Sequence, residues 1–112
     1  FNSYAQRLNT FQEVVYALGS TGGTLAPDFA NGTIQTLTLT SNLTLNSLTN
    51  AVAGRSMTLL ITQDGTGSRT LTSSMIFAEG SKTLSTSAGS KDAITILYDG
   101  TTYWASLTKG YA

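Results

Sequence analysis

The residues of this sequence that could do chemistry gather at positions 64–69, which read Asp-Gly-Thr-Gly-Ser-Arg. Two glycines, hydroxyl groups and a cation at this spacing are what a phosphate-cradling loop needs. Such a loop also needs a following helix whose free amides point at the anion, and a Walker-type loop adds a lysine. Residues 68–72 instead alternate like a strand and contain no lysine. The stretch therefore favours a turn between two paired strands over a phosphate site.

The sequence contains few of the residue types that enzymes use for catalysis. The sequence contains no His and no Cys, so the commonest general base, the thiol nucleophile and most transition-metal ligands are missing. Two carboxylates could flank a sugar as in glycosidases, but aspartates beside turns usually cap backbone amides. We therefore expect no catalytic residue among the carboxylates, which are Glu13, Asp28, Asp64, Glu79, Asp92 and Asp99.

Asp64 and Asp99 are the carboxylates to consider for a metal ion. Each stands alone in its loop, whereas Ca²⁺ prefers several clustered oxygen ligands. They would form a cage only if the two loops met at one end of the domain. We expect no metal site and no cofactor.

Tyr103 and Trp104 are neighbours in an alternating stretch, so their side chains point to opposite faces of a strand. One of them must face solvent or another subunit, and an exposed aromatic ring near threonine and aspartate could stack on a sugar. Roles in the core and in a subunit interface are the favoured alternative. The candidate glycan contacts are Asp64, Asp99, Tyr103 and Trp104.

The composition limits the partners. A chain of 112 residues makes one domain with a modest core, and only 11% of its residues are charged, against about 25% in ordinary globular proteins. Six basic residues balance six acidic ones, so we expect no nucleic-acid partner. No apolar run is long enough to span a bilayer, and we expect no membrane partner.

The elements that must position these side chains are strands. From residue 33 onward apolar and polar residues alternate, with Leu37 and Leu39 on one face, although Ile34 is one residue out of phase. That shift indicates a bulge near Gln35 or a different neighbour for that end. Turn dipeptides at 31–32, 64–65 and 99–100 suit tight hairpins. We predict a mainly β fold, an antiparallel β-sandwich or jelly-roll-like domain over residues 20–112.

Residues 1–19 differ, and we assign them to a segment that connects the domain to a shaft. Apolar residues at spacings of three and four favour a short helix over residues 1–11 that passes into a strand. Alternatively, residues 13–18 form the first strand, with residues 23–26 as its hairpin partner. The start at Phe1 suggests a processed chain or the end of a longer one. If three copies associate, the helical interface is Phe1, Tyr4, Leu8 and Phe11.

Residues 34–45, 54–72, 82–86 and 92–107 resemble a module of tailed-bacteriophage virion proteins. The resemblance covers residues 24–112 and consists of a Gln-Asp-Gly-x-Gly turn, a Leu-Ser-Thr stretch and an Asp-Gly hairpin, in that order. It implies a β-sandwich that serves as a virion building block, is commonly a homotrimer and has no catalytic activity. It transfers no active-site residue.

Three functions follow as expectations. The first is a structural, host-attachment module at the end of a tail fibre, located in the virion, with other virion proteins as partners. The second is a capsid decoration protein that clamps neighbouring shell subunits. The third is a carbohydrate-binding module that contacts host surface glycan.

Overall fold

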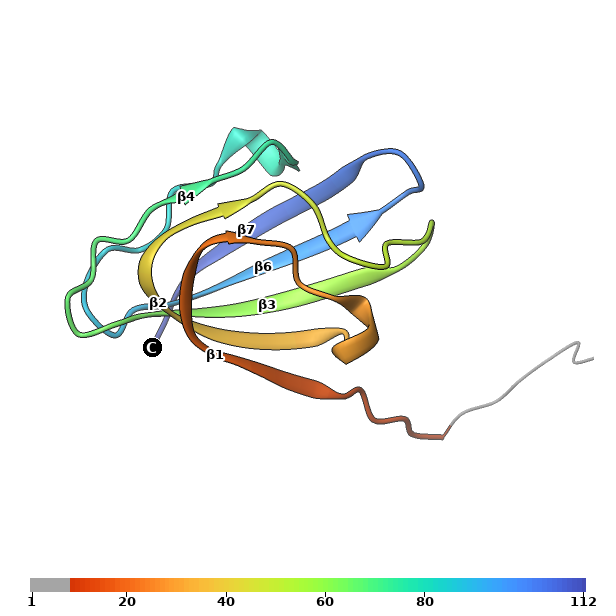
Figure 1. Ribbon diagram of the computed structural model, residues 1–112, viewed down its shortest axis with the longest axis horizontal. Coiled ribbons are helices and arrows are strands. Elements are labelled where there is room, and N and C mark those ends of the chain that lie inside the picture. The colour runs from red at the N-terminus through yellow and green to blue at the C-terminus, as the bar shows by residue number, and fades with distance from the viewer. Residues whose placement is uncertain (1–8) are drawn as a thin grey trace, which may run out of the picture.

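The structure, a computed structural model, describes residues 9–112 and joins seven strands in one mixed sheet (Figure 1). The order across the sheet is β1-β2-β3-β6-β7-β5, and β4 pairs with β2. The prediction of a mainly β fold is confirmed. The strands are β1 Val15–Leu25, β2 Ile34–Leu45, β3 Ser56–Gln63, β4 Leu71–Thr72, β5 Ile76–Phe77, β6 Lys91–Tyr98 and β7 Tyr103–Tyr111; two 3-10 helices are η1 Phe29–Asn31 and η2 Ala78–Gly80.

The first part of the chain winds through three stacked coils. Residues 15–21 of β1 pair in parallel with residues 34–39 of β2, and after a bend residues 23–25 pair with 43–45. The two arms of β2 pair in the same way with β3 and with β4. The crossovers stack too, since Asp28 and Thr49 form a parallel bridge. We call the segments 15–33, 34–55 and 56–75 coils 1, 2 and 3.

This parallel stacking differs from the antiparallel sandwich that the sequence predicted, and a sandwich is not confirmed. Antiparallel pairing is limited to β3 with β6 and β6 with β7, and the predicted hairpin at Asp99 and Gly100 joins the latter pair. The predicted hairpins at 31–32 and 64–65 are wrong. The first dipeptide lies in the crossover between parallel β1 and β2, and the second lies in the corner between β3 and β4.

The predicted N-terminal helix is also wrong where the structure describes it. Residues 9–14 are not helical, and residues 1–8 lie outside the described part of the chain. The alternative of a first strand is right from Val15 onward, but residues 23–25 continue that strand instead of folding back on it. β1 also runs through the boundary that we placed between residues 19 and 20. Adjacent β-branched residues and three glycines disfavour a helix here. Among residues 9–112, no helix is long and apolar enough to cross a membrane.

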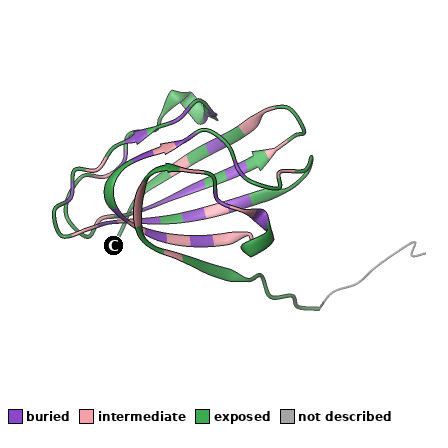
Figure 2. Cartoon of the chain, viewed as in Figure 1, coloured by how far each residue is buried: buried purple, intermediate pink, exposed green. Residues whose placement is uncertain are grey.

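The core lies on the inner face of the main sheet, under the bent arms and loops that fold back over it. Buried and less buried residues alternate along β3, along both arms of β2 and from Ile94 onward in β6 (Figure 2). The pairing of β2 is regular around Gln35, so no bulge lies there. Gln35 itself takes the core position, and its Nε2 donates hydrogen bonds to the carbonyls of Asp28 and Gly32. Ile34 therefore lies on the outer face, beside Val15 and Thr58.

Candidate ligand-binding surface

The stretch 64–69 forms a closed corner. Asp64 Oδ1 accepts hydrogen bonds from the amides of Thr66 and Gly67, at 3.1 and 3.0 Å, and Oδ2 pairs with Arg69 at 2.8 Å. These contacts, the hydrogen bond from Arg69 first, lower the pKa of Asp64. The amides that a phosphate would need already donate to the carboxylate. The stretch is a turn, but it is not the predicted turn between two paired strands, because β3 and β4 both pair with β2 and not with each other.

The corner is packed tightly against the loop that precedes β6. Gly67 has a φ of +73°, and a Cβ placed on it would lie 2.5 Å from the carbonyl oxygen of Thr86. The amide of Ser68 donates to the same oxygen at 2.7 Å. Buried Gln63 holds both loops, since its Nε2 donates to the carbonyls of Arg69 and Ser85. Asp64 and Arg69 are therefore parts of a rigid corner.

Asp99 and Trp104 meet in the β6–β7 hairpin. Asp99 Oδ1 accepts hydrogen bonds from the amides of Thr101 and Thr102, at 2.8 and 2.7 Å. Its Oδ2 accepts from the indole Nε1 of Trp104 at 2.8 Å. The indole donor, and then the two amides, lower the pKa of Asp99. The carboxylate closes the turn and fixes the orientation of an indole that is 49% exposed.

Tyr103 lies on the opposite face, as the alternation predicted. Its ring packs against the core and lies 4.6 Å from that of Tyr98, measured between centroids. Its hydroxyl contacts the backbone of Leu48, accepting from the amide at 3.2 Å or donating to the carbonyl at 3.3 Å. Tyr103 thus fastens the second crossover to the sheet, while Trp104 faces outward.

The four candidate glycan contacts do not converge on one place. Asp64 follows β3 and Asp99 follows β6, and because these strands are antiparallel the two loops lie at opposite ends of the sheet. The idea that the two loops meet to form a calcium cage is therefore wrong. Among residues 9–112, no group of three or more carboxylates could hold a metal ion. Of the four, only Asp99 and Trp104 are brought together.

A groove lies beside Trp104, on the outer face of the sheet. In the register, Trp104 stands between Ile76 of β5 and Leu97 of β6, and the neighbouring row holds Thr95 and Ser106. These residues and Glu79 of η2 line a hollow of about 550 Å³, within the roughly 300–1,000 Å³ of ordinary ligand pockets. Glu79 is one of the six carboxylates expected to be non-catalytic, and no spacing in the sequence marks it as a partner of Trp104.

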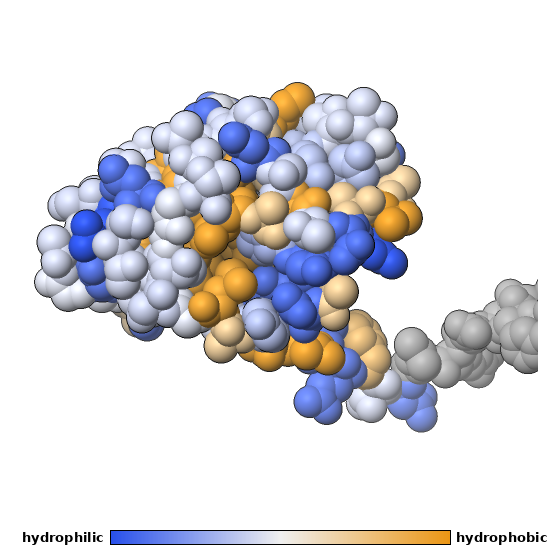
Figure 3. Space-filling model, viewed as in Figure 1, coloured by the Kyte–Doolittle hydropathy of each residue, from blue (hydrophilic) through white to orange (hydrophobic). Residues whose placement is uncertain are grey.

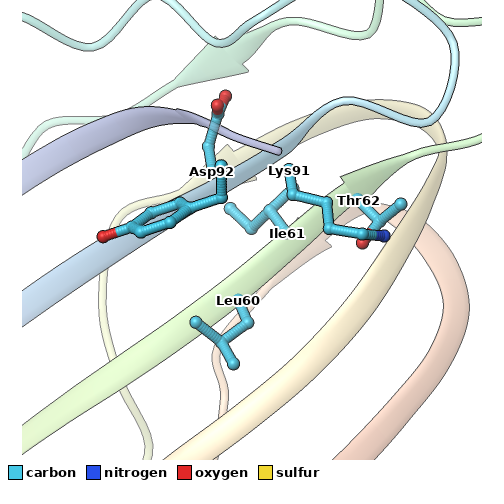
Figure 4. A pocket seen from close by; sticks show the side chains of 6 residues that line it. Leu60, Ile61, Thr62, Lys91 and Asp92 are labelled. Carbon is cyan, nitrogen blue, oxygen red and sulfur yellow. The ribbon is translucent and has the colours of Figure 1, made fainter.

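A second, smaller hollow lies at the other end of the outer face. Leu60, Thr62, Lys91 and Tyr111 line it, and Tyr111 is 55% exposed. Figure 4 shows the carboxylate of Asp92 pointing away from the labelled side chains of Leu60 and Thr62. That carboxylate is buried, where it accepts hydrogen bonds from Ser85 and from the amide of Gly110. Asp92 is therefore a structural anchor.

The comparisons with known proteins place the chain among phage components. A family model described as "Putative phage tail fibre C-terminal domain" matches residues 24–103. The chain belongs to this family. As a tail fibre domain it is a structural, virion-associated protein, and the resemblance seen in the sequence is confirmed. No curated protein and no solved structure matches the chain.

The tail fibre domain exposes an apolar strip where the chain enters β1, before the matched range. Phe11 is 76% exposed and Val15 is 59% exposed, and Val14 and Tyr16 are exposed as well. Figure 3 shows apolar residues at the surface over the beginning of β1. Of the predicted interface residues, Phe11 belongs to this strip, and Phe1, Tyr4 and Leu8 lie outside the described residues.

Proposed function

We propose that this domain is the terminal, host-facing module of its tail fibre and that it assembles as a homotrimer without catalytic activity. Its partners are other copies of itself, other virion proteins and host surface glycan, and they include neither nucleic acid nor membrane. The observation that carries the proposal is the edge of β1, which no segment of residues 9–112 pairs with, beside an exposed apolar strip.

Strand β1 has few of the usual protections of an edge strand. It is 11 residues long, contains no charged residue and no proline, and pairs only with β2 among the described residues. Natural edge strands are usually short, charged, bulged away or covered, because an open edge pairs with other chains. β1 has bulges near Gly19 and Gly23, but residues 15–17 pair regularly with β2. Burial of this edge and of Phe11 between copies would also stabilise a small core by mass action.

The oligomeric mass tests the proposal. Light scattering after size exclusion at micromolar concentration should give three times the chain mass of 11.7 kDa. Val15→Lys should release monomers, because it places a charge on the apolar strip. Val52→Lys is the matched control, since Val52 is 51% exposed in the second crossover, and it should leave the trimer intact. A monomeric parent chain at this concentration refutes the homotrimer.

The alternative roles differ in where the domain lies on the particle. A capsid decoration protein would sit on the shell, whereas the family description favours the tail. Antibody labelling of virions, viewed by electron microscopy, distinguishes these positions. Label at the fibre tip supports the attachment module, and label spread over the shell supports decoration.

A further inference from the structure

We propose that the groove between η2 and β7 binds a pyranose sugar that carries no anionic group, with Trp104 as the stacking platform and Glu79 as the hydrogen-bond acceptor. The inference rests on the proposed attachment role, because it names the chemistry through which that role would be exercised. It differs from the sequence expectation, in which Asp64, Asp99, Tyr103 and Trp104 shared the contact.

The indole ring of Trp104 is held in one orientation before any ligand binds. Its only hydrogen-bond donor is used by Asp99 at 2.8 Å, so the ring cannot turn freely although about half of it is exposed. What remains for a partner is the π surface of the ring. Electron-rich aromatic faces attract the polarised C–H bonds of a sugar ring, and a fixed ring loses little entropy on binding. Asp99 is a positioning residue in this scheme.

Glu79 supplies the second, independent observation. Its backbone has φ 55° and ψ 18°, the left-handed region that glutamate rarely adopts. Strained backbone of this kind persists where the surroundings impose it and gathers at binding sites. Gly80 follows at φ +66°, and Glu79 is one of the residues that line the groove. A carboxylate there can accept hydrogen bonds from two adjacent hydroxyls.

The other residues that line the groove indicate which class of ligand it would bind. Thr95 and Ser106 offer hydroxyls, Ile76 and Leu97 offer apolar walls, and none of the residues that line the groove is a cation. An anionic sugar or a phosphate would face Glu79 without a compensating charge. A neutral pyranose presents an apolar face to the indole and hydroxyls to the polar side, so it matches both halves of the groove.

Trp104 is the only tryptophan in the chain, so its fluorescence reports on this groove alone. The assembled protein is titrated with lactose, cellobiose, maltose and diacetylchitobiose, and with sialyllactose as the anionic comparison. We expect a saturable change in emission with at least one neutral sugar and none with sialyllactose. Glu79→Gln should weaken that binding by about tenfold, because a neutral amide replaces the charged acceptor and an NH2 donor replaces one of its two oxygens.

Two further variants separate recognition from folding. Glu79→Gly should melt at the same or a higher temperature, because glycine relieves the positive φ, and should still lose binding. Tyr111→Ala removes an aromatic ring of similar exposure at the far end of the same face, and it should bind like the parent. A lower melting temperature for Glu79→Gly would show that the strain premise is wrong.

Sugar binding by the groove and assembly of the trimer can be tested separately. Trp104→Ala, followed by saturation-transfer NMR with the sugar that binds, should lose the signal and keep the oligomeric mass. If the variant becomes monomeric, the groove is a subunit contact and the inference is overturned. If no neutral sugar changes the emission of a trimeric parent, the inference is overturned while the proposed function stands. Sugar binding by a monomeric parent supports the groove and refutes the trimer.

Discussion

Gly67→Ala should destabilise the domain more than Gly65→Ala or Gly89→Ala. A left-handed backbone costs an L-residue about 1–2 kcal/mol, and Gly67 has a φ of +73°. The new Cβ would also lie 2.5 Å from Thr86 O and 2.9 Å from Ala88 N. Both are backbone atoms that cannot rotate aside, so the loops must separate and lose the bond from Ser68 to Thr86, worth about 1 kcal/mol. We expect a loss of about 2–3 kcal/mol in the free energy of unfolding.

Substitutions at two nearby glycines separate the conformational contribution to this loss from the steric one. Gly65 has no positive φ, and no atom lies within 4 Å of its added Cβ, so Gly65→Ala should change stability by less than about 0.5 kcal/mol. Gly89 has a φ of +77° and open space, so Gly89→Ala should show the conformational cost alone. Thermal melts at one fixed protein concentration measure all three, and about 4 °C corresponds to 1 kcal/mol at this size. If Gly67→Ala melts at the same temperature as Gly89→Ala, the close approach of the two loops is refuted.

Other substitutions test the coils, the buried amide and the hairpin. Gly22→Ala should separate coil 1 from coil 2, because the added Cβ would lie 2.1 Å from Ser41 Oγ and 2.9 Å from the Ser41 carbonyl oxygen. Hydrogen exchange of the β1 amides should then be faster than in the parent. Exchange at the parent's rate would count against the stacking of the two coils. Gln63→Leu should lower the free energy of unfolding, measured in urea, by about 2–4 kcal/mol, because it leaves the amide and carbonyl of Arg69 and the carbonyl of Ser85 without their hydrogen-bond partner. A decrease of less than about 1 kcal/mol would contradict the buried network. The lowered pKa of Asp99 means that its contribution to stability is complete above its ordinary pKa, near 4, and is lost as the pH falls through the lower folded value. Trp104 emission should therefore change below about pH 4, and the change should be absent in Asp99→Asn; an identical acid profile for both proteins would refute the role of that carboxylate.

The alternation of residues predicted much of the core. Leu37 and Leu39 are buried as the period of two indicated, and the opposite orientations of Tyr103 and Trp104 followed from the same rule. Strand direction could not be predicted in this way, because side chains alternate identically in parallel and antiparallel sheets. A dipeptide such as Asp64-Gly65 fits a corner between stacked arms as well as a hairpin.

The candidate site was predictable only in part. Asp99 and Trp104 are five residues apart around one hairpin, so their proximity could be read from local sequence. Glu79 could not be found, because its place depends on the pairing of β5 with β7 and on a backbone conformation that glutamate rarely adopts. The helix prediction was wrong over residues 9–11, because three-and-four spacing also occurs by chance in a short stretch that ends in a strand.

The position of β1 decides how the domain carries mechanical load. β1 is the outermost strand, and it runs parallel to β2 along almost its whole length. Force applied at Val15 along the strand axis would stretch every hydrogen bond between β1 and β2 at once, so they would resist together. Force applied across the sheet would open the same bonds one after another, starting from Val15. A fibre that pulls along this strand would therefore hold its tip far more firmly than one that pulls sideways.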